Sequence, residues 1–101
     1  MKSMQEQLLR EIKSYTRGSE PSALAMLQAP RIDYWEPEVR RRGKEFVLVI
    51  RGEVTKHPDI EDGDTIQTSV VVWFDRKRRF VRTLNRIYAL GKPGTAGGVR
   101  Q

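Results

Sequence analysis

The sequence predicts an α+β fold in which two N-terminal helices pack on a small antiparallel sheet of about three strands. Three observations favour it: apolar residues recur at helical spacing near the N-terminus, they run or alternate as in strands from Phe46 onward, and breaker residues separate these stretches. A chain of 101 residues has the size of one domain. We therefore expect a single α+β domain over residues 1–90 and a flexible C-terminal tail over 91–101, where glycine is frequent and no periodicity is visible.

The first helix is predicted from a stripe of apolar residues at helical spacing: Met4, Leu8, Ile12 and Tyr15. Ser3 and Glu6 have the spacing of a capping box, in which each side chain satisfies a free backbone amide at the start of a helix. Gly18 can end the helix in a left-handed conformation. The beginning and the end of this element are thus both indicated by local chemistry.

A short second helix follows, with a start signal at residues 19–21 and apolar residues at Ala23, Leu24 and Leu27. Pro30 limits its length. Residues 31–37 contain three apolar side chains beside Pro30 and Pro37, which indicates an extended segment laid over the core rather than a regular element.

The sheet is predicted to consist mainly of residues 45–55, 65–75 and 79–89. The run 46–50 is continuously apolar, as in a strand covered on both faces, and the loop 55–64 is rich in turn residues. Residues 80–90 are ambiguous, because their apolar residues also fit one stripe of a helix with Gly91 as its C-cap. A helical last element is therefore an open alternative.

A spaced pattern runs through the second half of the chain: Gly52, Val54, His57, Pro58, Gly63, Ile66, Thr68, Ser69, Asp75, Arg82, Thr83, Arg86, Tyr88, Leu90 and Gly91. In this pattern the chain resembles a family of uncharacterised small bacterial and phage-borne proteins, a domain of unknown function. The resemblance implies that the segment around Arg82 and Thr83 is the returning strand of a hairpin, and it favours a strand for residues 80–88. It implies no activity and no site residue.

Positive charge is concentrated towards the end of the chain. The net charge is +6, and residues 75–101 alone carry a net +7, whereas residues 46–74 carry −3. A field of this kind favours polyanions or acidic protein surfaces as partners. The basic residues form two runs, namely Arg40, Arg41, Arg42 and Lys44, and then Arg76, Lys77, Arg78, Arg79, Arg82 and Arg86.

The two basic runs would meet if strands 46–54 and 65–75 paired as a hairpin, because residues 42–44 and 75–79 would then lie at one end of the sheet. Arginines gathered in this way suit phosphate, with Tyr34, Trp35 or Tyr88 as stacking partners for bases. We therefore predict a non-enzymatic small basic protein that contacts nucleic acid phosphate. A solubilising surface without a ligand is the simpler reading of the same charges.

A protein partner is the alternative. Trp73 and Phe74 point to opposite faces of a strand, so one of them needs cover from a helix or from another chain. A face that holds Trp73 could then serve a homodimer or a partner, and the chain could act as an inhibitor or adaptor of the kind carried by mobile elements, docking on an acidic host protein.

Other kinds of site are not favoured. His57 stands in a turn-forming His-Pro-Asp sequence without a nucleophile and a carboxylate at catalytic spacing, so we expect no enzyme. The acidic loop 59–64 lacks the spacing of a calcium loop, and we expect neither a metal nor a cofactor. The absence of cysteine and of an apolar N-terminal or membrane-spanning stretch favours a cytoplasmic protein without membrane contact.

Overall fold

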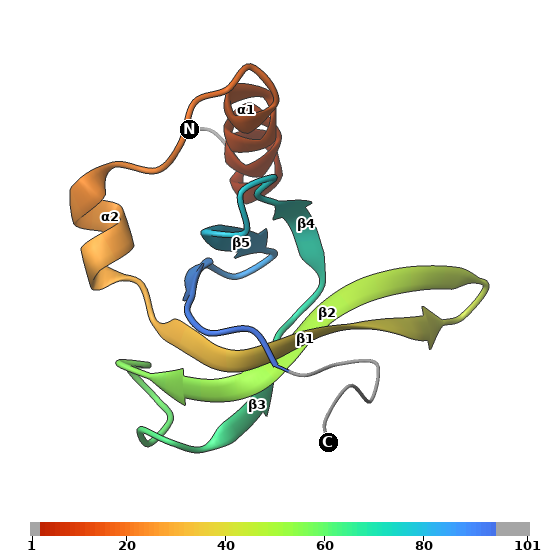
Figure 1. Cartoon of the computed structure of the whole chain (residues 1–101). Coiled ribbons are helices and arrows are strands. Elements are labelled where there is room, and N and C mark those ends of the chain that lie inside the picture. Colours follow the sequence, from red (N-terminus) through yellow and green to blue (C-terminus); the bar gives the residue numbers. More distant parts are fainter. Residues whose placement is uncertain (1–2, 95–101) are drawn as a thin grey trace.

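The computed structural model describes residues 3–94, and over this range the chain forms two helices and six strands (Figure 1). The helices are α1 (Met4–Thr16) and α2 (Ala23–Gln28). The strands are β1 (Arg31–Arg42), β2 (Glu45–Thr55), β3 (Thr65–Gln67), β4 (Val71–Phe74), β5 (Phe80–Thr83) and β6 (Ile87–Leu90). The predicted α+β arrangement of two helices on an antiparallel sheet of about three strands is therefore wrong, because a six-stranded mixed sheet dominates the fold.

The sheet has the strand order β3-β2-β1-β6-β5-β4, with β1 and β6 parallel and every other pair antiparallel. Its edge strands β3 and β4 are joined by only three residues, 68–70. A flat sheet would hold these edges about 24 Å apart, whereas the four Cα–Cα steps from Gln67 to Val71 span at most about 14 Å. The sheet must therefore roll up until its two edges approach each other.

The crossing segment 68–70 is hydrogen-bonded to both sides of the roll. The backbone amide of Thr68 donates to the carbonyl of Ile50 in β2 at 2.8 Å, and the Thr68 hydroxyl accepts from the Ile50 amide at 3.0 Å. Val70 O accepts from the backbone amide of Leu84, just after β5, at 3.0 Å. The continuous strand 65–75 predicted from the sequence is thus two short strands on opposite edges, because the chain must leave one edge to reach the other.

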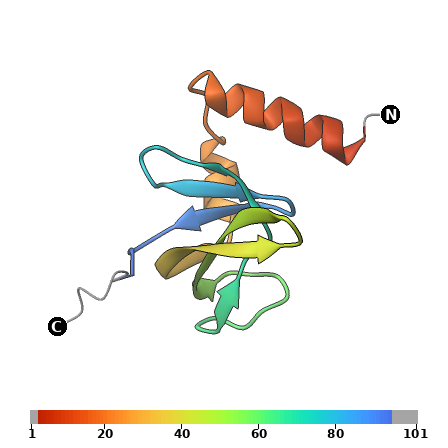
Figure 2. The same ribbon diagram turned by 90° about the vertical axis from the view of Figure 1, so that its right-hand side faces the viewer.

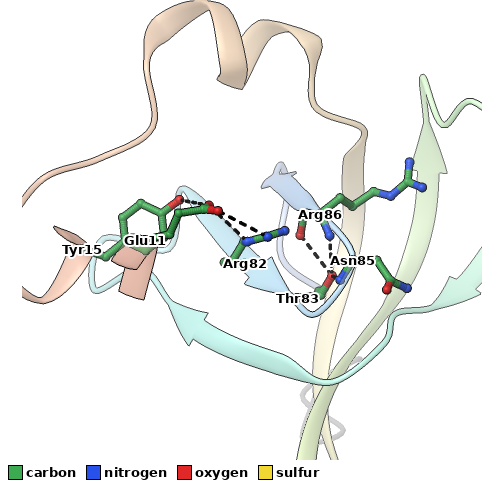
Figure 3. A network of polar contacts seen from close by, with 6 residues as sticks. All are labelled: Glu11, Tyr15, Arg82, Thr83, Asn85 and Arg86. Atoms are coloured by element: carbon green, nitrogen blue, oxygen red, sulfur yellow. Dashed lines mark hydrogen bonds and ion pairs between the residues drawn. The ribbon is translucent and has the colours of Figure 1, made fainter. Parts of the chain in front are cut away.

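The last predicted element is also two strands. Thr83 is fully buried, and its hydroxyl accepts hydrogen bonds from the backbone amides of Asn85 and Arg86 and donates to the Arg86 carbonyl (Figure 3). This local hydrogen bonding reverses the chain between β5 and β6. Both the single strand 79–89 and its helical alternative are therefore wrong, although the strand conformation that the resemblance implies is found on either side of the turn.

The hydrophobic core lies inside the rolled sheet and includes Ile32, Trp35, Ile50, Val54, Val81 and Tyr88. Helix α1 lies across one end of this roll (Figure 2), where the buried Tyr15 packs edge-on against Phe80 at 5.3 Å between ring centroids. The Ser3 half of the predicted capping box is confirmed, since Ser3 Oγ accepts from the backbone amide of Glu6. The second helix starts later than predicted, with Ser22 rather than residues 19–21 as its N-cap.

The predicted domain limit at residue 90 falls inside the hydrogen-bonded chain. Gly91 N donates to Ile32 O at 2.8 Å and Gly94 N to Trp35 O at 2.8 Å, so residues 91–94 continue beside β1. The rest of the predicted tail, residues 95–101, lies outside the described range. The segment 31–37, expected to be irregular, is the first half of the long strand β1.

Candidate nucleic-acid interface

The longest feature of the fold is the β1–β2 hairpin, whose outer half projects beyond the rolled sheet (Figure 1). We call residues 38–48 the arm. Its strands are joined by Gly43 and Lys44, and Gly43 has a φ of 62°. Glycine with positive φ at the first position of a two-residue loop matches a type II′ turn, whose twist suits a hairpin. The basic run that contains Arg40–Lys44 is therefore the tip of a β-ribbon.

One face of the arm is apolar. The register places Val39 opposite Leu48 and Arg41 opposite Phe46, and residues directly opposite in an antiparallel pair point to the same side. Val39 is 68% exposed and Phe46 is 71% exposed. The guanidinium of Arg41 lies 6.0 Å from the centre of the Phe46 ring. The arm thus presents an aromatic ring, an aliphatic side chain and a cation together to solvent.

The other face of the arm carries charged side chains beside Val47, which lies opposite Arg40. Arg40 donates to Glu38 at 2.9 Å and to the Gln67 side chain at 2.7 Å, and Glu38 also lies 3.7 Å from Arg51. The Arg40 side chain is therefore engaged in contacts within the protein. Arg42 and Lys44 at the tip form no ion pair with any residue in the described range, so their charges are available to a ligand.

The β4–β5 turn carries the second basic cluster. Asp75 closes it by accepting from the backbone amide of Arg79 at 2.9 Å and from Arg79 Nε at 3.0 Å. Burial raises the pKa of Asp75, but the hydrogen bonds and charge of Arg79 outweigh burial and hold that pKa below its usual value. Arg79 also pairs with Glu20 at 2.6 Å. The Arg79 side chain thus stabilises the turn through its contacts with Asp75 and Glu20.

The three cations between Asp75 and Arg79 are exposed, and none forms an ion pair within the part of the chain that the structure describes: Arg76, Lys77 and Arg78. Arg78 takes a left-handed conformation with a φ of 58°, which the tight turn requires. Folding therefore leaves the charge of these three side chains directed to solvent.

A groove of about 650 Å³ separates this turn from the base of the arm. We call it the basic groove, and it is lined by Trp35, Pro37, Leu48, Phe74, Asp75, Arg76, Arg78, Pro93 and Gly94. Its floor includes the edge-to-face pair of Trp35 and Phe74, with ring centroids 5.7 Å apart. Because Leu48 belongs to the apolar face of the arm, that face continues directly into the groove.

The structure joins only part of the two predicted basic runs. Strand β2 pairs with β3 and not with β4, so the hairpin assumed from the sequence does not form over its full length. The rolled sheet nevertheless brings Arg76 and Arg78 to the same groove as the base of the arm. The tip residues Arg42 and Lys44 lie further out along the ribbon.

Arg82 lies elsewhere and is engaged within the protein. Its Nε is 3.3 Å from Glu11 Oε1, and its side chain is 14% exposed (Figure 3). The buried Nε makes no well-aligned hydrogen bond, but Nη2 of Arg82 donates to Glu11 Oε2 at 3.5 Å. Tyr15 OH donates to the same carboxylate at 3.2 Å, and burial together with Glu11 raises the pKa of Tyr15 to about 12. Arg82 thus ties β5 to α1.

The Arg86 side chain points away from Arg82 (Figure 3), but both residues line one cleft of about 510 Å³, which also includes Lys56 and Pro58 and is separate from the basic groove. The neighbouring His57 stacks on Tyr88 at 6.1 Å between ring centroids, and its Nδ1 accepts from the backbone amide of Asp59. Burial and then the charge of Arg86 hold the pKa of His57 below its usual value. His57 therefore acts as a neutral cap of its turn.

The predicted stacking residues are mostly inaccessible. Trp35 is 5% exposed and Tyr88 is 6% exposed, so neither ring can receive a base, whereas Tyr34 is exposed on another side of β1. Phe46 is not among the binding residues that the sequence predicts. The sequence did contain an indication of its position, because a two-residue turn at Gly43–Lys44 would put Phe46 opposite Arg41 near the tip of a hairpin.

Trp73, the predicted partner face, is half-buried and packs against Tyr15 at 6.1 Å between ring centroids.

No model of a protein family, no curated protein and no solved structure matches the chain.

Within residues 3–94 no group of histidine and acidic side chains is arranged to hold a metal ion. No helix in that range is long and apolar enough to cross a membrane. The arm and the basic groove are therefore the features on which a function for this chain can be based.

Proposed function

We propose that this protein binds nucleic acid, with the arm and the β4–β5 turn contacting phosphate and without catalysing a reaction. One observation carries the proposal: five cations that form no ion pair within the described residues lie on the arm tip and on the turn beside the basic groove, namely Arg42, Lys44, Arg76, Lys77 and Arg78. A phosphate backbone is the ligand that best matches several such charges along one surface.

The shape of the arm supports the same proposal. A two-stranded β-ribbon can enter a groove of nucleic acid or lie along a strand. The arm is such a ribbon, with its base fixed in the rolled core and its tip in solvent. Arg41 adds a sixth cation, whose Nε donates to the Gly43 carbonyl at 3.1 Å and thereby holds the guanidinium at the tip.

Salt-dependent affinity tests the proposal. We expect labelled oligonucleotides to bind the protein with an affinity that falls steeply as salt rises, because each phosphate contact releases counterions. The triple variant Arg76→Gln, Lys77→Gln, Arg78→Gln should lower the magnitude of the slope of log K against log salt by about 2–3, from roughly 0.7–0.9 per contact. Fluorescence anisotropy at a series of salt concentrations measures both quantities.

The matched control removes three exposed cations from α1 and its C-cap residue: Arg10→Gln, Lys13→Gln, Arg17→Gln. It changes the net charge by the same amount and should leave the slope nearly unchanged. If both triple variants reduce affinity equally, net charge alone explains binding and the proposed site is wrong. If affinity barely depends on salt, the proposed function is wrong.

The protein-binding alternative predicts a different result. Exposed Val39 and Phe46 beside Arg41 would also suit an acidic protein surface with apolar residues. In that case a partner should remain bound after nuclease treatment and be lost when Arg76, Lys77 and Arg78 are changed to glutamate.

We further propose a cytoplasmic location, which the cysteine-free composition favours, and a relationship to the phage-borne family, which the spaced pattern favours.

A further inference from the structure

The apolar face of the arm is unusual for a surface whose only task is to hold phosphate. Val39 and Phe46 lie on the same side of the ribbon as Arg41, and both are among the most exposed large apolar side chains in the described range. Exposed apolar area in water is unfavourable and marks a binding surface when it is contiguous. These side chains therefore need a partner with apolar area of its own.

The same face leads into the basic groove without a break. From the tip inward the cross-strand pairs on this side are Arg41 with Phe46, Val39 with Leu48, and Pro37 with the buried Ile50. Pro37 and Leu48 also line the groove, whose other wall bears Arg76 and Arg78. A ligand on this path would meet apolar side chains along one edge and cations along the other.

Unpaired nucleic acid has the matching chemistry. Its bases expose flat π-faces that stack on aromatic rings, while its phosphates follow along one side. A duplex hides those faces in its stack and offers only polar base edges and phosphates. On a duplex Phe46 and Val39 would gain little, whereas on a single strand Phe46 and the Arg41 guanidinium can both contact one base.

We propose that the arm and the basic groove form a binding site for single-stranded nucleic acid, in which a base stacks on Phe46 and the strand continues into the groove between Leu48 and Arg76. The inference rests on the proposed function and adds the class of ligand. The groove volume of about 650 Å³ falls within the range of roughly 300–1,000 Å³ that is usual for ligand pockets, so there is room for nucleobases beside the apolar floor.

The test compares one sequence as a single strand and as a blunt duplex at a fixed salt concentration. The wild-type protein should bind the single strand more tightly. Phe46→Ala should weaken single-strand binding by about 5- to 150-fold, the range that loss of one stacked base produces, and should change duplex binding by less than about twofold. Phe46→Tyr should retain most of the affinity, because it keeps the ring.

Leu24→Ala is the matched control, since Leu24 on α2 is 62% exposed and lies outside the groove lining. It should leave both affinities unchanged. Circular dichroism and thermal unfolding should show that the Phe46→Ala protein is folded, because the removed ring is mostly in solvent.

Three outcomes overturn the inference, and each leaves a different account standing. Equal, salt-dependent binding of single strand and duplex that Phe46→Ala does not alter would keep the proposed function and remove the stacking site. Loss of dimerisation in Phe46→Ala, with single-strand affinity unchanged, would assign the apolar face to a second copy of the chain. Absence of salt-dependent binding to either nucleic acid would reject the proposed function itself.

Discussion

The two halves of the β1–β2 hairpin belong to one continuous strand pair but have opposite surroundings. In the inner half, Ile32, Ile50 and Val54 are all 0% exposed, whereas in the arm Val39 and Phe46 are mostly in solvent. Both halves contain β-branched or aromatic residues that favour strands. The difference shows that burial in the roll, and not strand propensity, separates the residues that hold the fold from those that are free to bind.

The inner half of the hairpin contains a β-bulge. Tyr34 and Trp35 of β1 face the single residue Gly52 of β2, and Tyr34 has a φ of 54°, which is strained for a side chain other than glycine. The extra residue of a bulge bends its strand locally. Here the bulge lies within the core, since Trp35 is buried and so is Ile50 beyond it.

The largest expected effect on stability comes from a change at this bulge. A Cβ at residue 52 would lie 2.5 Å from Ile32 Cγ2 and 2.8 Å from the backbone oxygen of Asp33. Since the backbone cannot move aside cheaply, Gly52→Ala should lower the free energy of unfolding by about 1–3 kcal/mol or more. Denaturant unfolding followed by circular dichroism measures the change.

Gly43→Ala at the tip of the arm is the control for this prediction. No atom lies within 4 Å of the added methyl group there, so only the positive φ is penalised, by about 1 kcal/mol. A Gly52→Ala protein that is as stable as the Gly43→Ala protein would show that the bulge is looser than described.

The next effect concerns the turn that faces the arm. Asp75→Asn removes the charge that holds Arg79, and it should lower the free energy of unfolding by about 1–2 kcal/mol, a range reduced because the Arg79 partner is half-exposed. The turn should loosen, and with it the placement of Arg76 and Arg78. Asp59→Asn in the exposed loop is the control and should change stability by less than about 0.5 kcal/mol.

The pH dependence of Asp75 has a definite sign. Its pKa in the folded protein is lower than the 3.8 of a free aspartate side chain, so the unfolded chain binds more protons between the two values. The stability difference between wild type and Asp75→Asn should therefore be full above pH 5 and shrink as the pH falls below about 4 through the folded-state pKa. A difference that grows with acidity would contradict the assigned contacts.

The smallest effect on stability belongs to the arm. Phe46→Ala, which should weaken single-strand binding most, is expected to change the free energy of unfolding by less than about 0.5 kcal/mol, because the ring is 71% exposed. A larger loss in thermal or denaturant unfolding would mean that Phe46 is part of the core packing rather than of a binding surface.

The sequence predicts elements that depend on neighbouring residues better than elements that depend on distant ones. The Ser3 cap and helix α1 follow from local hydrogen bonding and spacing, and they are found as predicted. The break at Thr68–Val70 has no comparable local cause, because it exists to carry the chain between the two edges of the roll. The outer part of β1 escaped prediction because a ribbon exposed on both faces shows no apolar alternation.

The same reasoning applies to the candidate site. Counting charges identified both basic runs, but it could not distinguish free cations from paired ones. Arg82 meets Glu11 across 71 positions of sequence, and only the packing of α1 on the sheet reveals that pair. Arg79 could have been assigned to Asp75, four residues earlier, from the turn sequence alone.

Mapping the contact surface tests the central claim most directly. Titration of isotope-labelled protein with an unlabelled single strand, followed by amide chemical shifts, should move resonances of residues 39–46 and 76–78 most. Those of α2 and of the Lys56–Pro58 segment should move least. Shifts centred instead on the cleft of Lys56 and Arg86 would contradict the assignment of binding to the arm and the basic groove.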